Sequence, residues 1–401
     1  MTIDFDLPDN LRNVRDMAHW FAKEHIRPVA IEADRTGRIP GALLAQMKQL
    51  GISGGAVYRE KGAGGIKGAG KNPEKFINRL AILGVEELSW GDPSVLLSAA
   101  GPGLGGPPVR FMGTPAQKER FFSVFDSDEL RWGAYALTEP AAGSDVAGIQ
   151  TTCRKEGDEW VINGVKCYIT NGARAAWVVC FATLDPKMGR GGHRAFVVEQ
   201  GRPGFRLGRV EKKMGLRASE TAELVFEDCR VPADNLLGGD EHYARKEGFM
   251  GAMKTFDSTR PMVASMAVGI ARAALEETEA FYRDNYMTAR PIPRYRRLAT
   301  RLAAMRRQLS TARLMCWRAA WLADHDIANA KEAAMCKAYA PRAAQDIATG
   351  CLQVLGAHGV ADGSLVEKCF RDLKVYDIFE GTGQIQRIVI SKRIIEGLKR
   401  F

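Results

Sequence analysis

The sequence predicts a multi-domain α+β protein with an N-terminal helical domain, a central β-barrel-like domain and a C-terminal four-helix bundle. The length of 401 residues corresponds to two or three domains of about 150 residues each. Its 46% apolar and 26% charged residues are typical of a folded globular chain and exclude a disordered one. Apolar residues recur at helical spacing near both ends and at strand spacing between them. We expect domains at 1–128, 129–242 and 243–401.

Helices are expected throughout the first of these domains. Apolar residues recur at helical spacing near the start, at Leu11, Val14, Ala18 and Phe21. Further along, Thr114 precedes Pro115 and is followed three positions later by Gln117. This is the arrangement of a capping box with proline in the first turn, so it predicts that a helix begins at residue 115.

Short strand-like runs follow from about residue 130. The runs 160–164 and 166–170 are joined by Asn163-Gly164, a dipeptide that favours a tight β-turn, so they predict a hairpin. Four further runs have strand character, at 177–183, 194–199, 205–210 and 223–231. Together they predict a compact β domain.

The helical period returns at about residue 245 and holds to the end. Two helices of the predicted bundle are marked by the apolar sets Val263, Met266 and Ile270, and Ile385, Ile388 and Ile395. A helical bundle is therefore expected at the C-terminal end of the chain.

Charge and cysteine usage narrow the function classes. Lysine and arginine number 57 against 47 acidic residues, a net charge of +10 that suits a nucleic acid, a membrane surface or an anionic small molecule. The eight cysteines include no C-x-x-C pair, so we expect buried free thiols and no metal site.

No apolar run reaches the roughly 18–20 residues of a membrane span, and the acidic start lacks a targeting pattern. We expect a cytoplasmic protein.

The densest group of polar and small residues lies between Tyr135 and Asp145. Thr138 and Ser144 supply hydroxyl groups, and small residues let a planar or phosphorylated ligand approach backbone amides closely. The alternative is an elaborate loop that only leads into the β domain.

Two other segments could carry chemistry. Tyr168 and Thr170 are two residues apart on a strand, so a flat ring could lie on the tyrosine while the threonine bonds its edge. A cross-strand aromatic pair is the alternative. Glu380 lies between apolar neighbours and Gly381, where desolvation would raise its pKa and suit it to general-base catalysis. A surface glutamate before a helix capped by Thr382 is the alternative.

Six segments resemble, in order and spacing, the FAD-dependent acyl-CoA dehydrogenase family. They are LTEPAAGSD, the pair WVING and YITNG, KMGLRASETAELVFEDCRVP, FDSTRP, QVLGAHG and FEGTGQIQR. The resemblance covers nearly the whole chain. It implies that Glu380 removes the α-proton of an acyl-CoA thioester while hydride passes to flavin N5, giving a trans-2-enoyl-CoA. It also implies electron transfer to an electron-transfer flavoprotein, and FDSTRP looks most like the medium-chain branch.

The resemblance also implies roles for individual residues. Contacts to FAD are implied for Tyr135, Leu137, Thr138, Ser144, Tyr168, Ile169, Thr170, Thr382 and Gln384. Contacts to the FAD of a neighbouring subunit are implied for Gln353, Gly356 and Ala357. Contacts to the substrate are implied for Ser144, Asp257, Arg260 and Gly381.

One segment departs from the family pattern. The family carries R-x-x-F-G and a later Gln that contact FAD across a dimer interface, whereas ungapped alignment places Asn285, Thr288, Ala289 and Arg296 there. An arginine-rich run replaces the motif, with Arg290, Arg294, Arg297 and Arg301 on one helical face. These arginines could form a solvated basic face. Alternatively, Arg290 and Arg294 could reach the neighbour's FAD pyrophosphate, or a different homologous chain could complete the site.

The quaternary state and the competing functions are also read from the family. The resemblance implies a homotetramer built as a dimer of dimers, with a heteromeric enzyme as one alternative. Nucleic-acid binding by a basic relative is another, but only Tyr295 and Trp317 lie close to the arginines, so the interleaved aromatics of single-strand binders are missing. Because these aromatics are missing, we expect no nucleic-acid partner.

An acyl-CoA oxidase would share the half-reaction but is usually a longer chain.

Overall fold

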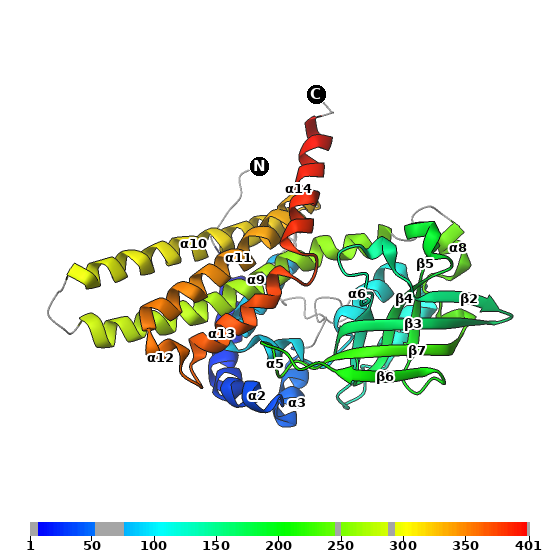
Figure 1. Cartoon of the computed structure of the whole chain (residues 1–401), viewed down its shortest axis with the longest axis horizontal. Helices are drawn as coiled ribbons and strands as arrows, with labels where there is room; N and C mark the ends of the chain where they lie inside the picture. Colours follow the sequence, from blue (N-terminus) through cyan, green and yellow to red (C-terminus); the bar gives the residue numbers. More distant parts are fainter. Residues whose placement is uncertain (1–6, 53–75, 245–249, 288–292, 399–401) are drawn as a thin grey trace.

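The computed structural model describes residues 7–52, 76–244, 250–287 and 293–398. Helices from both ends of the chain pack together on one side of the molecule, and a curled β-sheet from the middle of the chain lies on the other (Figure 1). The predicted order of a helical domain, a β domain and a helical bundle is confirmed.

The N-terminal part is helical, as predicted. Its α-helices are α1 (Asp9–Phe21), α2 (Ala30–Thr36), α3 (Gly41–Gln49), α4 (Ile77–Gly91), α5 (Pro93–Leu97), α6 (Gly106–Met112) and α7 (Pro115–Ser123). The capping box is present at α7, because the Thr114 hydroxyl accepts a hydrogen bond from Gln117 N at 3.2 Å and the Gln117 side chain accepts one from Thr114 N at 3.0 Å. Both bonds satisfy amides that the first helical turn would otherwise leave free.

The central part is a seven-stranded mixed sheet. Its strands are β1 (Trp132–Ala136), β2 (Thr152–Glu156), β3 (Glu159–Thr170), β4 (Ala175–Thr183), β5 (His193–Glu199), β6 (Phe205–Val210) and β7 (Thr221–Pro232). The strand order is β1-β4-β2-β3-β7-β6, with β5 paired to β4. The β1–β4 and β2–β4 pairs are parallel and the others antiparallel. The sheet curls around a core of its own (Figure 1).

The hairpin predicted at Asn163-Gly164 is wrong. Residues 159–170 form one continuous strand, and the chain turns instead between β2 and β3, at Gly157. At Gly164 the pairing of β3 with β7 shifts register, with φ at +152°, and a Cβ there would lie 2.7 Å from Thr151 Cα. Gly164 is needed because the strand bulges here and passes close to the backbone of Thr151. A glycine required by a bulge cannot be told from a glycine required by a turn in the sequence alone.

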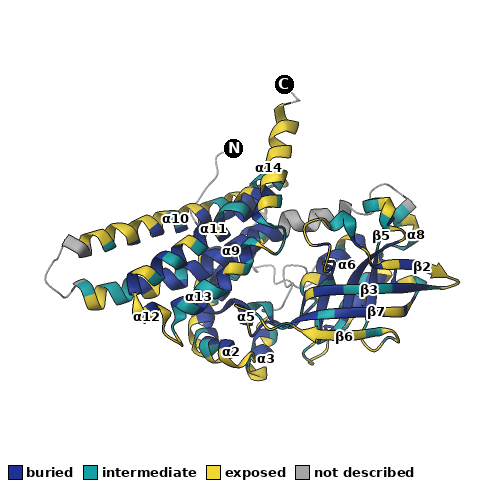
Figure 2. Ribbon diagram, viewed as in Figure 1, coloured by how far each residue is buried: buried dark blue, intermediate teal, exposed yellow. Residues whose placement is uncertain are grey.

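The C-terminal part is again helical. Its α-helices are α8 (Gly239–Ala244), α9 (Met250–Tyr282), α10 (Pro293–Asp324), α11 (Ala330–Leu355), α12 (Ala357–Val360), α13 (Leu365–Leu373) and α14 (Gly383–Leu398). Helix α9 packs against α10, α11 and α13, and also against α4 of the N-terminal part. The buried faces of these helices make one continuous core (Figure 2).

Small residues and a buried ion pair join the two helical parts. Gly269 of α9 lies against the backbone of α4, where a Cβ would collide with the Glu86 carbonyl. The Arg79 guanidinium of α4 donates to the Asp324 carboxylate at the end of α10 at 2.9 Å, and both side chains are buried. Because an unpaired buried charge is costly, this pair fixes how α4 and α10 sit together.

Other expectations concern thiols, membranes and the last helix. All eight cysteines are free and buried, as predicted. Among the helices that the structure describes, none is long and apolar enough to cross a membrane. Helix α14 forms where expected but extends away from the rest of the chain (Figure 1), and Ile388 and Ile395 on it are 49% and 53% exposed.

Candidate active site

Glu380 lies on a tight turn between two helical segments. A short 3-10 helix (Lys374–Asp377) precedes it, and α14 begins at Gly383. The backbone is left-handed at Glu380, with φ at +55°, and at Gly381, with φ at +91°. A non-glycine residue pays a steric penalty in this conformation, so surrounding contacts must hold it.

The Glu380 side chain is half-buried, and helix α9 supplies its hydrogen-bond donor. The Thr259 hydroxyl donates to Glu380 Oε2 at 3.0 Å. Burial raises the pKa of Glu380, while the Thr259 bond and the charges of Lys337 and Arg260 oppose that rise. The net direction is upward, so the carboxylate is a stronger base than an exposed glutamate. The direction of the shift is the expected one, but Ile378, one of the two apolar neighbours on which the expectation rested, is 54% exposed.

Tyr135 of β1 lies within electrostatic reach of Glu380. Burial raises the pKa of the Tyr135 phenol, and the negative charge of Glu380 raises it further. The edge of the sheet therefore faces the turn that carries the carboxylate. Thus a residue predicted to line a cofactor and the predicted base belong to one site.

The loop after β1 is fixed by a buried ion pair. The Lys166 ammonium donates to Glu139 Oε1 at 2.7 Å and to the Leu137 carbonyl at 3.1 Å. Glu139 also accepts from the backbone N–H groups of Gln150 and Thr151, at 2.6 and 3.0 Å. Burial would raise the pKa of Glu139, but Lys166 and these donors lower it on balance. The loop is therefore held in one shape with its carboxylate charged.

The two predicted cofactor segments lie side by side. The Cys167 amide donates to the Thr138 carbonyl at 2.9 Å, which joins the loop to β3. Ser144 is exposed at the far end of that loop. A ligand could therefore contact both segments at once.

Tyr168 presents its ring to the surface. Its side chain is 64% exposed and its φ is +59°, at a second register shift in β3, while Ile169 is buried. This exposure excludes the alternative of a packed cross-strand aromatic pair. An open ring on β3 and, on the adjoining loop, the exposed hydroxyl of Ser144 fit a planar, phosphorylated cofactor.

The residues around the start of α14 have mixed roles. The Thr382 hydroxyl accepts from Ile385 N at 3.3 Å and so caps the helix, as the alternative interpretation proposed. Gln384 is exposed. Arg260 is buried in α9 and close enough to Glu380 to lower its pKa. Thr382 and Gly381 thus shape the turn whatever else they contact.

Several predicted residues lie elsewhere. Gln353, Gly356 and Ala357 are at the α11–α12 junction, at the end of the bundle away from the sheet (Figure 1), so this chain does not bring them to Glu380. Asp257 is in α9 and Arg294 in α10, but their side chains fall outside the described residues. Arg290 lies outside them entirely.

Part of the arginine-rich run is engaged within the chain. Arg301 donates to the Gln353 side chain, and Arg306 pairs with Glu279. Arg313 pairs with Glu86 at 2.6 Å. The run therefore also joins the helices of the bundle.

Several residues at the site were missed from the sequence, among them Thr259 and three buried donors. Lys337, Lys166 and Gln386 are fully buried, and each donates to the backbone of a predicted segment. For Lys337 a signal was present, because it stands among small apolar residues in AAMCKAYA. A lysine in such a run needs a polar partner inside the protein.

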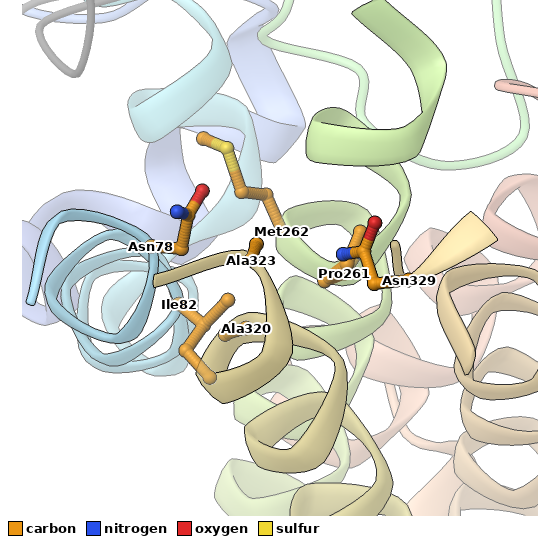
Figure 3. A pocket seen from close by; sticks show the side chains of 7 residues that line it. All are labelled: Asn78, Ile82, Pro261, Met262, Ala320, Ala323 and Asn329. Carbon is orange, nitrogen blue, oxygen red and sulfur yellow. The ribbon is translucent and has the colours of Figure 1, made fainter. Parts of the chain in front are cut away.

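A small cavity lies beside the N-terminal half of α9 (Figure 3). It is lined by Asn78, Ile82, Pro261, Met262, Ala320, Ala323 and Asn329. Its volume of about 10 Å³ has room for one water molecule at most. It is too small to hold an acyl chain.

Comparisons with known proteins agree along the whole chain. Three sequence models match: the N-terminal domain of acyl-CoA dehydrogenase at 8–125, the middle domain at 134–229 and the C-terminal domain at 246–395. The chain is 37% identical over 394 residues to a short-chain specific acyl-CoA dehydrogenase of Clostridium acetobutylicum, covering 98% of this chain and 100% of that one.

Solved structures show the same likeness. Butyryl-CoA dehydrogenase from Megasphaera elsdenii superposes with a TM-score of 0.87 at 34% identity, covering 98% of this chain and 100% of that one. A chain from a study of the electron transferring flavoprotein of Acidaminococcus fermentans superposes with a TM-score of 0.86 at 34% identity, covering 98% and 99%. The chain belongs to the FAD-dependent acyl-CoA dehydrogenase family.

Proposed function

We propose that this enzyme removes the α-proton of an acyl-CoA thioester with the Glu380 carboxylate. The observation that carries the proposal is the placement of Glu380. Its carboxylate has a raised pKa, accepts a bond from Thr259, and lies within electrostatic reach of Tyr135 at the edge of the sheet. A base with a pKa nearer to neutrality transfers protons more effectively at physiological pH.

The reaction balances as a two-electron oxidation. The α-proton goes to Glu380, and the electron pair left on Cα forms the new double bond to Cβ. FAD supplies the acceptor for the hydride that leaves Cβ. Tyr135, Leu137, Thr138, Ser144, Tyr168, Ile169, Thr170, Thr382 and Gln384 would hold FAD, and Ser144, Asp257, Arg260 and Gly381 would contact the substrate. Preorganised donors at the thioester oxygen typically contribute about 3–4 kcal/mol each to such a step.

We propose a short acyl group as the substrate. The names of the Clostridium and Megasphaera relatives specify short-chain and butyryl substrates. The medium-chain preference expected from FDSTRP stays a prediction, and these names favour the shorter chain. The likeness to a chain studied with the electron transferring flavoprotein of Acidaminococcus fermentans supports such a flavoprotein as the electron acceptor.

We also propose that copies of this chain associate as a homotetramer. The apolar residues exposed on α14 support contact with another copy, among them Ile394 at 49% and Leu398 at 68%. Gln353, Gly356, Ala357, Arg290 and Arg294 would reach the FAD of the neighbour. A reducing compartment such as the cytoplasm suits its eight free thiols.

The test compares wild type with Glu380→Gln and, as a control, with Glu396→Gln, which changes an exposed glutamate of α14. Each protein is titrated anaerobically with butyryl-CoA and octanoyl-CoA while the flavin absorbance is followed. We expect bleaching in wild type and control, and at least about 100-fold slower bleaching in Glu380→Gln. Equal bleaching in Glu380→Gln would exclude it as the base, and faster bleaching with octanoyl-CoA would exclude the short-chain preference.

A further inference from the structure

The turn that carries Glu380 is closed by a lysine from another helix. The Lys337 ammonium, on α11, donates to the Tyr376 carbonyl at 2.7 Å and to the Gly381 carbonyl at 3.2 Å. These carbonyls lie on either side of Glu380 along the chain. One ammonium therefore joins the two ends of the turn.

A second buried side chain supports the same turn without a charge. The Gln386 amide, on α14, donates to the Gly381 carbonyl at 3.0 Å and to the Glu380 carbonyl at 3.3 Å. Both Lys337 and Gln386 have no exposed surface. The left-handed backbone at Glu380 is thus held by two donors, of which only Lys337 is ionised.

Among the described residues, none of the hydrogen-bond acceptors of Lys337 is a carboxylate. Its acceptors are backbone carbonyls, and burial lowers the pKa of Lys337 to about 8, against the opposing influence of Glu380 and Asp377. Such a lysine is retained at a cost to stability, because an ammonium in the interior loses its hydration. Holding the turn requires only a neutral donor, so the positive charge itself calls for an explanation.

We propose that Lys337 is a positioning residue for the base: it closes the Glu380 turn and holds a positive charge behind the carboxylate. This inference rests on the proposed role of Glu380. A positive charge favours the ionised form of a carboxylate, so it keeps Glu380 ready to accept a proton despite burial. Among the described side chains, the other groups that face this pair are Thr259 and Arg260 from α9, Tyr135 from β1, Asp377 from the turn and Cys336 from α11.

The two functions of Lys337 can be separated by substitution. Lys337→Met removes the donor and the charge at nearly constant volume, and Lys337→Gln removes the charge but keeps a donor. Gln386→Leu is the matched control, because it removes neutral bonds to the same turn and leaves the charge in place. All variants are studied as FAD-loaded protein.

The first readout is the rate of flavin bleaching by butyryl-CoA from about pH 6 to pH 9. Loss of the charge raises the pKa of Glu380. In the profile of rate against pH, we therefore expect the midpoint of the rise on the acid side (the acid limb) to move up by about one pH unit in both Lys337 variants. Gln386→Leu should lower the maximal rate and leave the midpoint of the acid limb in place. An unmoved limb in the Lys337 variants, or an equal shift in Gln386→Leu, would overturn the proposal.

The second readout does not require turnover. Infrared difference spectra of the carboxyl stretch, recorded during a pH titration and referenced to Glu380→Gln, report the protonation of Glu380 directly. We expect the midpoint to be about one unit higher in Lys337→Gln than in wild type. Should Lys337→Met fail to fold, Lys337→Gln carries the test. If Glu380→Gln bleaches normally the proposed function fails, whereas an inert Glu380→Gln with unmoved Lys337 profiles rejects the role of Lys337 alone.

Discussion

Two loops carry residues of the candidate site, and each is fixed by a buried lysine with different partners. In the cofactor loop (residues 137–145), the Lys166 ammonium donates to the Glu139 carboxylate at 2.7 Å. In the base turn (residues 376–382), the Lys337 ammonium donates to backbone carbonyls at 2.7 and 3.2 Å. The cofactor loop is therefore held through an ion pair, whereas the base turn is held by an ammonium whose hydrogen bonds go to backbone carbonyls.

The difference suits the roles that we propose for the two loops. A surface that binds a cofactor needs a fixed shape, and a neutralised pair provides this without placing a net charge beneath the ligand. A general base needs a tuned pKa as well as a fixed position: the hydrogen bonds of Lys337 fix the turn, and its charge acts on the pKa of Glu380. A third buried lysine shows the effect of carboxylate partners. Lys368 bonds Asp372 and Asp92, and these two charges raise its pKa above the ordinary value although burial alone would lower it. Lys337, which bonds carbonyls, has a lowered pKa.

The largest effect should follow from breaking the neutral pair. Lys166→Met would leave the Glu139 carboxylate, which is 5% exposed, buried without its counter-charge. We expect a loss of about 3–5 kcal/mol in the free energy of unfolding, measured by urea titration, and weaker retention of FAD on gel filtration. The double variant Lys166→Met/Glu139→Gln should recover most of this loss. A cost below about 1 kcal/mol would show that the pair does not fix the cofactor loop.

These lysines also mark the limit of what the sequence could predict. The strand at 177–183 follows from a continuous apolar run, the strand at 205–210 from alternation and the helix beginning at residue 115 from its capping box, and all are present. Glu380 could be singled out by its apolar neighbours. The hydrogen bonds of Lys337 and Lys166 could not be predicted, because they join residues that lie 39 and 27 positions apart in the sequence. The exact domain boundaries stay a prediction, as do the contacts of Arg290 and Arg294.

The second largest effect should be a dependence of the free energy of unfolding on pH that is caused by Lys337. Burial lowers its folded pKa to about 8, below the roughly 10.4 of an unfolded lysine. Between these values the unfolded chain binds more protons than the folded one, so stability contributed at this position rises with pH. Relative to Lys337→Met, wild type should gain about 3 kcal/mol of unfolding free energy between pH 8 and about pH 10.5, measured by urea titration.

The control for this prediction is again Gln386→Leu. No titrating group is lost in that variant, so its stability relative to wild type should stay constant over the same pH range. A constant difference for Lys337→Met as well would mean that Lys337 keeps its proton in the folded state. The base turn would then resemble the cofactor loop, and the contrast between the two would fail.

The smallest effect should come from the bulge that sets the position of Lys166. Gly164 allows β3 to pass Thr151, and a methyl group there would lie 2.7 Å from Thr151 Cα. Gly164→Ala should cost about 2 kcal/mol in the free energy of unfolding through this overlap, and should weaken FAD retention, because Lys166 follows two residues later. Gly157→Ala is the matched control, since its φ is +61° but no atom lies within 4 Å of the added methyl. Only the left-handed backbone penalty of about 1 kcal/mol applies there, with FAD retention unchanged. If both variants retain FAD equally well, the bulge at Gly164 does not influence the cofactor loop.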